Sequence, residues 1–221
     1  MEYKSTANIA RLHFITNQWS KQPIPEQVQQ FLAAGGRWVQ LRIKDLPEAE
    51  ITSIALQVQA LCKTHGATYI VNDRVALAKQ IDADGVHLGK EDLCPTEARK
   101  ILGSGKIIGV TANSRADLER VIHFPADYIG IGPYRHTKTK QKLATPMGTE
   151  GFRNHAIWMQ QQKNTLPMVG VGGIHPGDIA AICGAGIQGI ALSSCISHAN
   201  NPADVTRQLI QQLEKHTTCY K

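Results

Sequence analysis

The sequence lacks the features that membrane, disulfide-bonded and zinc-binding proteins share. Its five cysteines are an odd number without a C-x-x-C pair, which argues against a disulfide framework and against zinc. No apolar run approaches the length of a membrane span, and the first twenty residues contain no secretory signal. We therefore expect a protein of the reducing cytoplasm, with no membrane partner.

Aromatic residues and clustered charge are also scarce. Aromatic residues make up 5% of the chain, and the 24 Lys and Arg residues form no basic run interleaved with aromatic side chains. A nucleic-acid-binding surface usually has such a basic stripe, so we expect no nucleic-acid partner. The net charge of +6 still favours anionic partners, and phosphorylated metabolites are the class that fits.

What the sequence does contain is a series of short, nearly continuous runs of Val, Ile and Leu. Such runs are typical of strands that are buried on both faces of a parallel sheet. Eight of them occur, at residues 12–16, 38–42, 68–71, 85–89, 106–111, 128–132, 168–173 and 189–193.

Helical patterns separate the runs. Residues 25–34 and 47–65 carry apolar side chains at helical spacing. Ser114 is expected to cap the helix that follows it, and Asn201 is expected to cap a helix that begins at Pro202.

The alternation of eight strands with helices predicts an α/β fold, a single (β/α)8 TIM barrel with parallel strands. A doubly wound open sheet is the alternative. It usually carries a G-x-G-x-x-G motif after the first strand, where this chain has Asn17-Gln18-Trp19. We expect residues 1–10 to form a loose leader and residues 11–221 to form the barrel domain.

A polar cluster closes the second predicted strand. Side chains alternate along a strand, so Gln40, Arg42 and Lys44 project to one side. By the same alternation, Leu41 and Ile43 face the helices. An amide and two cations would be costly in a dry core but are suited to a barrel mouth that holds an anion. Ion pairs with acids of neighbouring loops are the alternative for the two cations.

Two isolated carboxylates follow the third and fourth predicted strands. Asp73 comes after Asn72, and Asp92 comes after Gly89-Lys90-Glu91. Carboxylates at neighbouring strand ends can share Mg²⁺, which is usually bound by one or two carboxylates together with substrate phosphates. The simpler alternative makes Asp73 a helix cap and Asp92 part of a turn.

Two further segments have the chemistry of phosphate binding. Hydroxyl and ammonium groups alternate along residues 137–140, in the longest connection between strands, for which a solvated basic loop is the alternative. Gly173 follows the seventh strand, and Ser193 and Ser194 follow the eighth, where many barrels bind phosphate. His87 lies within the fourth strand and is expected to be a hydrogen-bonded lining residue.

Taken in order, these motifs resemble those of the thiamine phosphate synthase family over residues 12–196. They read Q-L-R-x-K, N-D-R, D-G-V-H-L-G-x-E-D, G-V-T, G-x-G-P-x3-T-x-T-K and G-G-I. The resemblance implies a transferase of thiamine biosynthesis that joins hydroxymethylpyrimidine diphosphate to a thiazole phosphate and releases pyrophosphate. It implies Mg²⁺ as the cofactor and leaves a homo-oligomer open.

The resemblance also implies residue roles. Arg42, Lys44 and Lys140 would be catalytic, and Asp73 and Asp92 would bind the metal. The pyrimidine diphosphate would be held by Gln40, Arg42, Lys44, Asn72, Thr111 and Lys140, and the thiazole phosphate by Thr137, Thr139, Gly173, Ser193 and Ser194. Leu41, Ile43 and Lys138 complete the expected substrate-binding set.

The sequence departs from the family pattern at Asn113, where a histidine is usual. The related thiazole tautomerases resemble the synthases in fold, depend on that histidine and tend to lack the T-x-T-K loop. The missing histidine and the present loop therefore favour a synthase over a tautomerase-like isomerase. The other alternative is a metabolite-binding barrel without activity. Such a protein would be expected to have lost some of the charged residues, and all five are present: Arg42, Lys44, Asp73, Asp92 and Lys140.

Overall fold

Eight parallel strands close into a barrel in the computed structural model, which describes residues 8–136 and 145–216. Each strand pairs with the next along the chain, and the last pairs with the first. The strands are β1 (Leu12–Ile15), β2 (Trp38–Leu41), β3 (Thr68–Asn72), β4 (Gly85–Leu88), β5 (Ile107–Ala112), β6 (Tyr128–Ile131), β7 (Met168–Val171) and β8 (Gly189–Leu192). Every predicted strand is present within two residues of its expected bounds, so the TIM barrel is confirmed.

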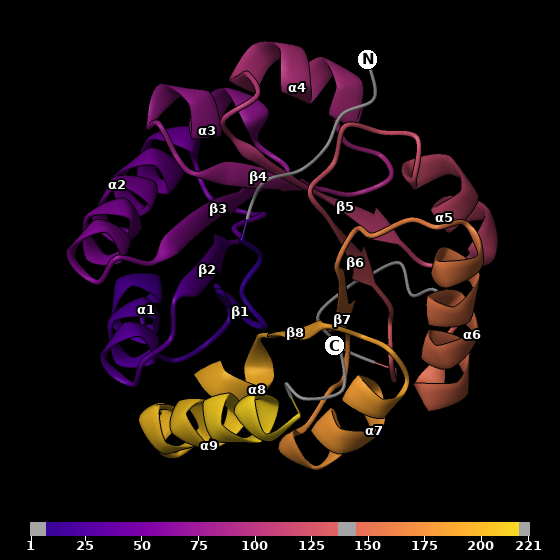
Figure 1. Ribbon diagram of the computed structural model, residues 1–221. Coiled ribbons are helices and arrows are strands. Elements are labelled where there is room, and N and C mark those ends of the chain that lie inside the picture. The colour runs from indigo at the N-terminus through magenta and orange to yellow at the C-terminus, as the bar shows by residue number, and fades with distance from the viewer. Residues whose placement is uncertain (1–7, 137–144, 217–221) are drawn as a thin grey trace.

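The helices form an outer ring around the strands (Figure 1). They are α1 (Ile24–Ala33), α2 (Glu48–Thr64), α3 (Val75–Gln80), α4 (Pro95–Leu102), α5 (Arg115–Val121), α6 (Gly148–Gln161), the short 3-10 helix η1 (Pro176–Asp178), α7 (Ile179–Gly184), α8 (Ser194–Ser197) and α9 (Pro202–Lys215). The helices predicted at 25–34 and 47–65 are confirmed. The helix expected after Ser114 is also confirmed and ends at Val121.

Both predicted helix caps are present. The Ser114 hydroxyl accepts a hydrogen bond from the Asp117 N–H at 3.2 Å, and the Asn201 side chain accepts one from the Asp204 N–H at 3.2 Å. The carboxylate of Asp117 accepts from the N–H of Asn113 at 2.9 Å. This second contact fixes the chain between β5 and α5, next to the barrel mouth.

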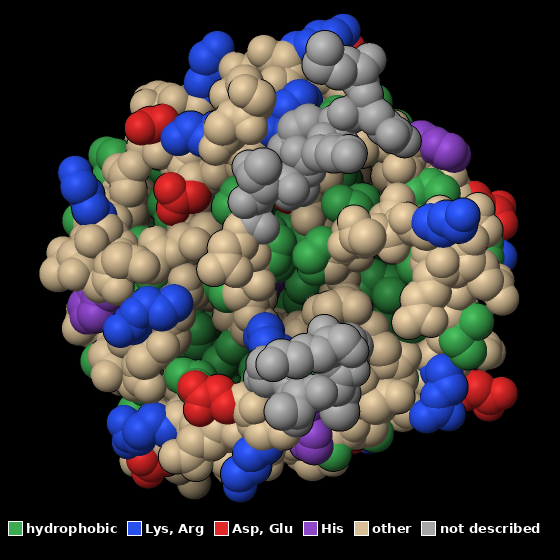
Figure 2. All heavy atoms as spheres, viewed as in Figure 1, with side chains coloured by type: hydrophobic (Ala, Val, Ile, Leu, Met, Phe, Trp, Pro, Cys, Tyr) green, Lys and Arg blue, Asp and Glu red, His purple; other side chains and the backbone are tan. Residues whose placement is uncertain are grey.

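The apolar side chains form two layers. The larger lies between strands and helices, and Leu41 and Ile43 belong to it. The smaller fills the barrel itself and consists of Trp38, Ile70, Tyr128, Val169 and Ala191. On the face shown in Figure 2, apolar side chains are visible in the hollowed middle, and basic side chains with fewer acidic ones are scattered around the edge. Across residues 8–136 and 145–216, no helix has both the length and the apolarity needed to cross a bilayer.

Candidate active site

A pocket of about 650 Å³ opens at the carboxyl ends of the strands. This end of a TIM barrel is where its enzymes have their active sites. The polar and aromatic side chains that line the pocket come from β1 to β6 and the loops after them, and they are His13, Trp19, Gln40, Arg42, Lys44, Asp45, Asn72, Asp73, His87, Lys90, Glu91, Asp92, Thr111, Asn113 and Tyr128.

The cations of the β2 end line this pocket as predicted. Gln40 is buried at the floor and hydrogen-bonds Tyr128. Burial lowers the pKa of Arg42, and the negative charges of Asp73 and Asp45 partly offset this effect. The guanidinium of Arg42 nevertheless stays charged at neutral pH. Lys44 forms an ion pair with Asp73, and both residues line the pocket. The alternative that the cations pair with acids of neighbouring loops is therefore confirmed for Lys44.

Asp73 and Asp92 meet at the ends of β3 and β4. Asp73 has a left-handed backbone (φ 65°), which aspartate tolerates, and its N–H donates to the His87 carbonyl at 2.9 Å. The helix-cap alternative is wrong for Asp73, since the residue at the N-cap of α3 is Arg74. Asp92 does close a turn, because its Oδ2 accepts from the Gly89 N–H at 2.7 Å.

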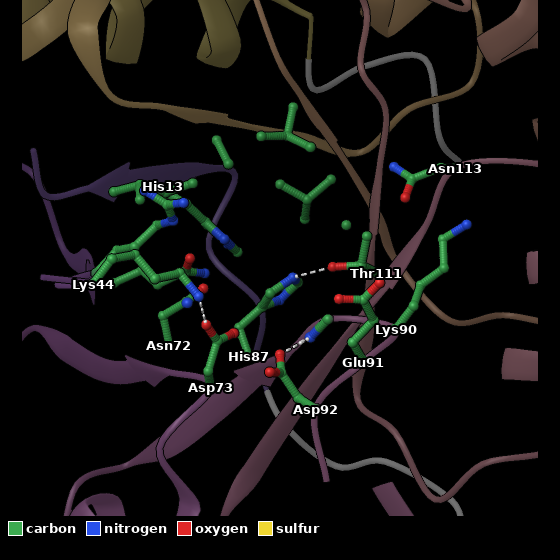
Figure 3. A pocket seen from close by; sticks show the side chains of 18 of the residues that line it. His13, Lys44, Asn72, Asp73, His87, Lys90, Glu91, Asp92, Thr111 and Asn113 are labelled. Carbon is green, nitrogen blue, oxygen red and sulfur yellow. Dashed lines mark hydrogen bonds and ion pairs between the residues drawn. The ribbon is translucent and has the colours of Figure 1, made fainter. Parts of the chain in front are cut away.

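The two carboxyl groups lie against each other. Burial, followed by this contact with Asp73, raises the pKa of Asp92 to about 6. Burial would also raise the pKa of Asp73, but hydrogen bonds from Asp92 and Lys44 take it below its ordinary value. Two carboxylates this close hold either a shared proton or a cation between them. Figure 3 shows Asp73 and Asp92 on the lower side of the pocket, with Lys44 beside Asp73.

His87 is a hydrogen-bonded lining residue, as predicted. Its Nδ1 lies 3.0 Å from the Tyr128 hydroxyl, and its Nε2 lies 2.9 Å from the hydroxyl of Thr111 (Figure 3). Asn72 and Thr111, both predicted to bind substrate, line the pocket beside it.

The side chains of Leu41 and Ile43 face away from the pocket, and the substrate-binding role assigned to these two residues stays a prediction. Both are buried in the apolar layer between strands and helices, at 2% and 6% exposure. Strand alternation accounts for this orientation.

Gly173, Ser193 and Ser194 follow β7 and β8 on the same rim, outside the lining of this pocket. Gly173 has a φ of 66°, and a Cβ there would come within 2.8 Å of the Arg135 Cβ. Arg135 donates to the Gly173 carbonyl at 3.1 Å and pairs with Asp178. A thiazole-phosphate site at these strand ends stays a prediction.

The predicted substrate loop falls outside the described residues. This applies to Thr137, Lys138, Thr139 and Lys140, whose assigned roles stay predictions.

The sequence argument missed several lining residues. Trp19 and Lys90 lie in the loops directly after β1 and β4, and their position after predicted strands could have identified them as lining residues. The ammonium of Lys90 lies 2.7 Å from Asp117, and Figure 3 shows Lys90 on the opposite side of the pocket from Lys44. His13 stacks on Trp38 inside the barrel with a ring separation of 4.2 Å, a contact between strands that the sequence does not reveal.

Comparison with known proteins identifies the family. The family model for thiamine monophosphate synthase matches residues 12–196, which span every strand of the barrel. The chain belongs to the thiamine monophosphate synthase family.

Individual members of the thiamine monophosphate synthase family match along most of the chain. A thiamine-phosphate synthase of Phocaeicola vulgatus is 44% identical over 199 residues, which cover 90% of this chain and 96% of that protein. One from Flavobacterium psychrophilum is 41% identical, covering 85% of this chain and 89% of that protein. Among solved structures, a thiamine phosphate pyrophosphorylase from Pyrococcus furiosus has a TM-score of 0.84 at 30% identity, covering 94% of this chain and 96% of that one.

Proposed function

We propose that this protein is a thiamine phosphate synthase. It joins the methylene carbon of hydroxymethylpyrimidine diphosphate to the ring nitrogen of a thiazole phosphate and releases pyrophosphate. The observation that carries the proposal is the convergence of Arg42 and Lys44 with the carboxylates of Asp73 and Asp92 at one rim of the barrel. Relatives that match along 85–90% of this chain bear that name.

Mg²⁺ is the cofactor that the carboxylate pair fits. Asp73 and Asp92 lie against each other, and when both are ionised a divalent cation between them would relieve their mutual repulsion. Mg²⁺ accepts one or two carboxylates and fills its other positions with water and substrate phosphate oxygens. When bound, it neutralises negative charge on the departing diphosphate.

The chain's own cations complete the leaving-group site. Arg42 and Lys44 stabilise the same charge from the β2 side. Arg42 is half-buried, and electrostatic stabilisation is stronger there than in water. Lys140 adds a third cation, and Gln40 and Thr111 orient the pyrimidine. The thiazole phosphate is held by Thr137, Thr139, Gly173, Ser193 and Ser194, with Lys138 next to them.

This division of labour suits a dissociative substitution. An electron-rich aminopyrimidine can stabilise positive charge on the methylene carbon as the carbon–oxygen bond to the diphosphate breaks. The thiazole nitrogen then forms the new bond while both partners are held in place. The side chains therefore act by position and charge, without a covalent protein intermediate.

A coupled assay tests the proposal. Purified protein, both substrates and Mg²⁺ should yield thiamine phosphate and one equivalent of pyrophosphate. A tautomerase-like isomerase would convert a thiazole substrate without releasing pyrophosphate, and a non-catalytic binder would bind without turnover. Either of those results would replace the synthase assignment.

A further inference from the structure

Trp19 is an exposed aromatic side chain at the mouth of the pocket. The chain has three tryptophans, and of these Trp38 and Trp158 are buried while Trp19 is 53% exposed. The Cζ atom of Arg42 lies over the Trp19 ring, 5.9 Å from its centroid. About half of the Trp19 side chain is therefore accessible at the pocket mouth, whereas the residues at the pocket floor are buried.

The loop that carries Trp19 is held by buried amides. Asn17 and Gln27 are 3% and 2% exposed, and they form a pair of hydrogen bonds: Asn17 N–H to Gln27 Oε1 at 3.1 Å and Gln27 Nε2 to the Asn17 carbonyl at 2.8 Å. The Trp19 N–H donates to the Asn17 side chain at 3.1 Å. The Asn17 amide in turn reaches the Ser197 hydroxyl at 3.2 Å, on α8. The indole is thus presented from a fixed backbone rather than from a free loop.

Trp19 lies between the two proposed anion sites. In the closed barrel, β1 pairs with β8 on one side and with β2 on the other. Ser193 and Ser194 follow β8, and Arg42 and Lys44 follow β2. The short way around the rim from a phosphate at the β8 end to a diphosphate at the β2 end therefore passes the end of β1, which Trp19 follows.

We propose that Trp19 is the surface on which the thiazole ring stacks, which makes it a specificity-determining residue for a planar second substrate. The inference rests on the proposed function. An indole offers a large flat face to a heteroaromatic ring, and such stacking is typically worth about 1–3 kcal/mol by alanine substitution, or roughly 5- to 150-fold in affinity.

Tryptophan emission tests the contact directly. Because Trp19 is exposed and the other two tryptophans are buried, titration with the thiazole phosphate should quench the exposed, red-shifted part of the emission. Inorganic phosphate, which lacks the ring, should not. Trp19→Phe should abolish the quench, and Trp158→Phe, on α6, should retain it. An equal quench by inorganic phosphate, or a quench that survives in Trp19→Phe, would overturn the proposal.

Steady-state kinetics provide the second readout. Trp19→Ala should raise KM for the thiazole phosphate about tenfold and leave KM for the pyrimidine diphosphate within twofold, while Trp19→Phe should recover most of the loss. An unchanged thiazole KM, or a rise confined to the pyrimidine diphosphate, would refute the assignment. If wild type forms no thiamine phosphate at all, the proposed function fails instead, whatever the fluorescence shows.

Discussion

Arg42 is the residue whose charge the proposed reaction uses most directly. It lines the pocket beside Asp73, and its guanidinium stays charged although burial lowers its pKa. We expect Arg42→Ala to lower kcat by about 10²–10³, the usual cost of one electrostatic stabiliser. Arg153→Ala is the matched control, because Arg153 is exposed on α6. A kcat for Arg42→Ala within tenfold of wild type would remove Arg42 from the leaving-group site.

His13 should make the stability of the protein sensitive to acid. Burial, together with the nearby His87, lowers the pKa of His13 to about 3, although its hydrogen bond to the Ala10 carbonyl favours the charged form. The unfolded chain takes up this proton near pH 6.5, so the unfolded state binds more protons between pH 6.5 and 3. His13 should therefore lower the free energy of unfolding by about 1.4 kcal/mol for each pH unit between pH 6.5 and 3, and should contribute no slope above pH 6.5. The raised pKa of Asp92 acts in the opposite sense below pH 6, so the contribution of His13 is the difference between wild type and a variant that lacks this histidine.

Urea unfolding at several pH values measures this slope. His13→Phe keeps a ring next to Trp38 and removes the titrating group, so its free energy of unfolding should fall less steeply with acid than that of wild type. His123→Phe, an exposed position after α5, should keep the wild-type slope. Parallel curves for wild type and His13→Phe would show that His13 is not the titrating group.

At the scale of elements, neighbouring strand ends create a site that neither strand has alone. Asp73 and Asp92 come from the ends of β3 and β4, and their carboxylates meet across the gap. Loss of a residue that only supports a metal ligand typically weakens metal binding roughly 10–100-fold. Asp73 is proposed as a ligand itself, so we expect Asp73→Asn to raise the Mg²⁺ concentration for half-maximal activity by at least that factor. Activity should also disappear in excess chelator and return with Mg²⁺.

The control for this metal prediction is Asp82→Asn. Asp82 follows α3 and pairs with Lys106, away from the lining of the pocket. It should leave the Mg²⁺ dependence unchanged. Full activity of wild type in chelator would contradict a metal role for the two carboxylates.

At the scale of the whole molecule, closing the barrel demands small residues opposite large ones. A Cβ on Gly109 of β5 would come within 2.2 Å of the Tyr128 ring, which fills the interior and hydrogen-bonds His87. Gly109→Ala should therefore lower the free energy of unfolding by about 1–3 kcal/mol through overpacking and should disturb the pocket floor. Gly105→Ala, where an added Cβ meets nothing within 4 Å, is the matched control, and equal stability of the two variants in urea would refute this account.

The residues with local signals were the predictable ones. Short apolar runs located all eight strands, and Ser114 and Asn201 marked helix starts, because strand burial and capping depend on neighbours along the chain. Alternation along the strand predicted that Arg42 and Lys44 line the pocket and that the Ile43 side chain faces the helices. The stack of His13 on Trp38 and the pairing of Lys90 with Asp117 had no such signal, because each joins different elements.

The sequence by itself determined which segments become strands, where several helices begin and which strands end in cations or carboxylates. Those properties depend on side chains a few residues apart. Only the tertiary structure decided that Asp73 touches Asp92, that His87 links Tyr128 to Thr111 and that Trp19 stands at the pocket mouth. Such contacts depend on how closure of the barrel brings strand ends together, and that geometry is a property of all eight strands at once.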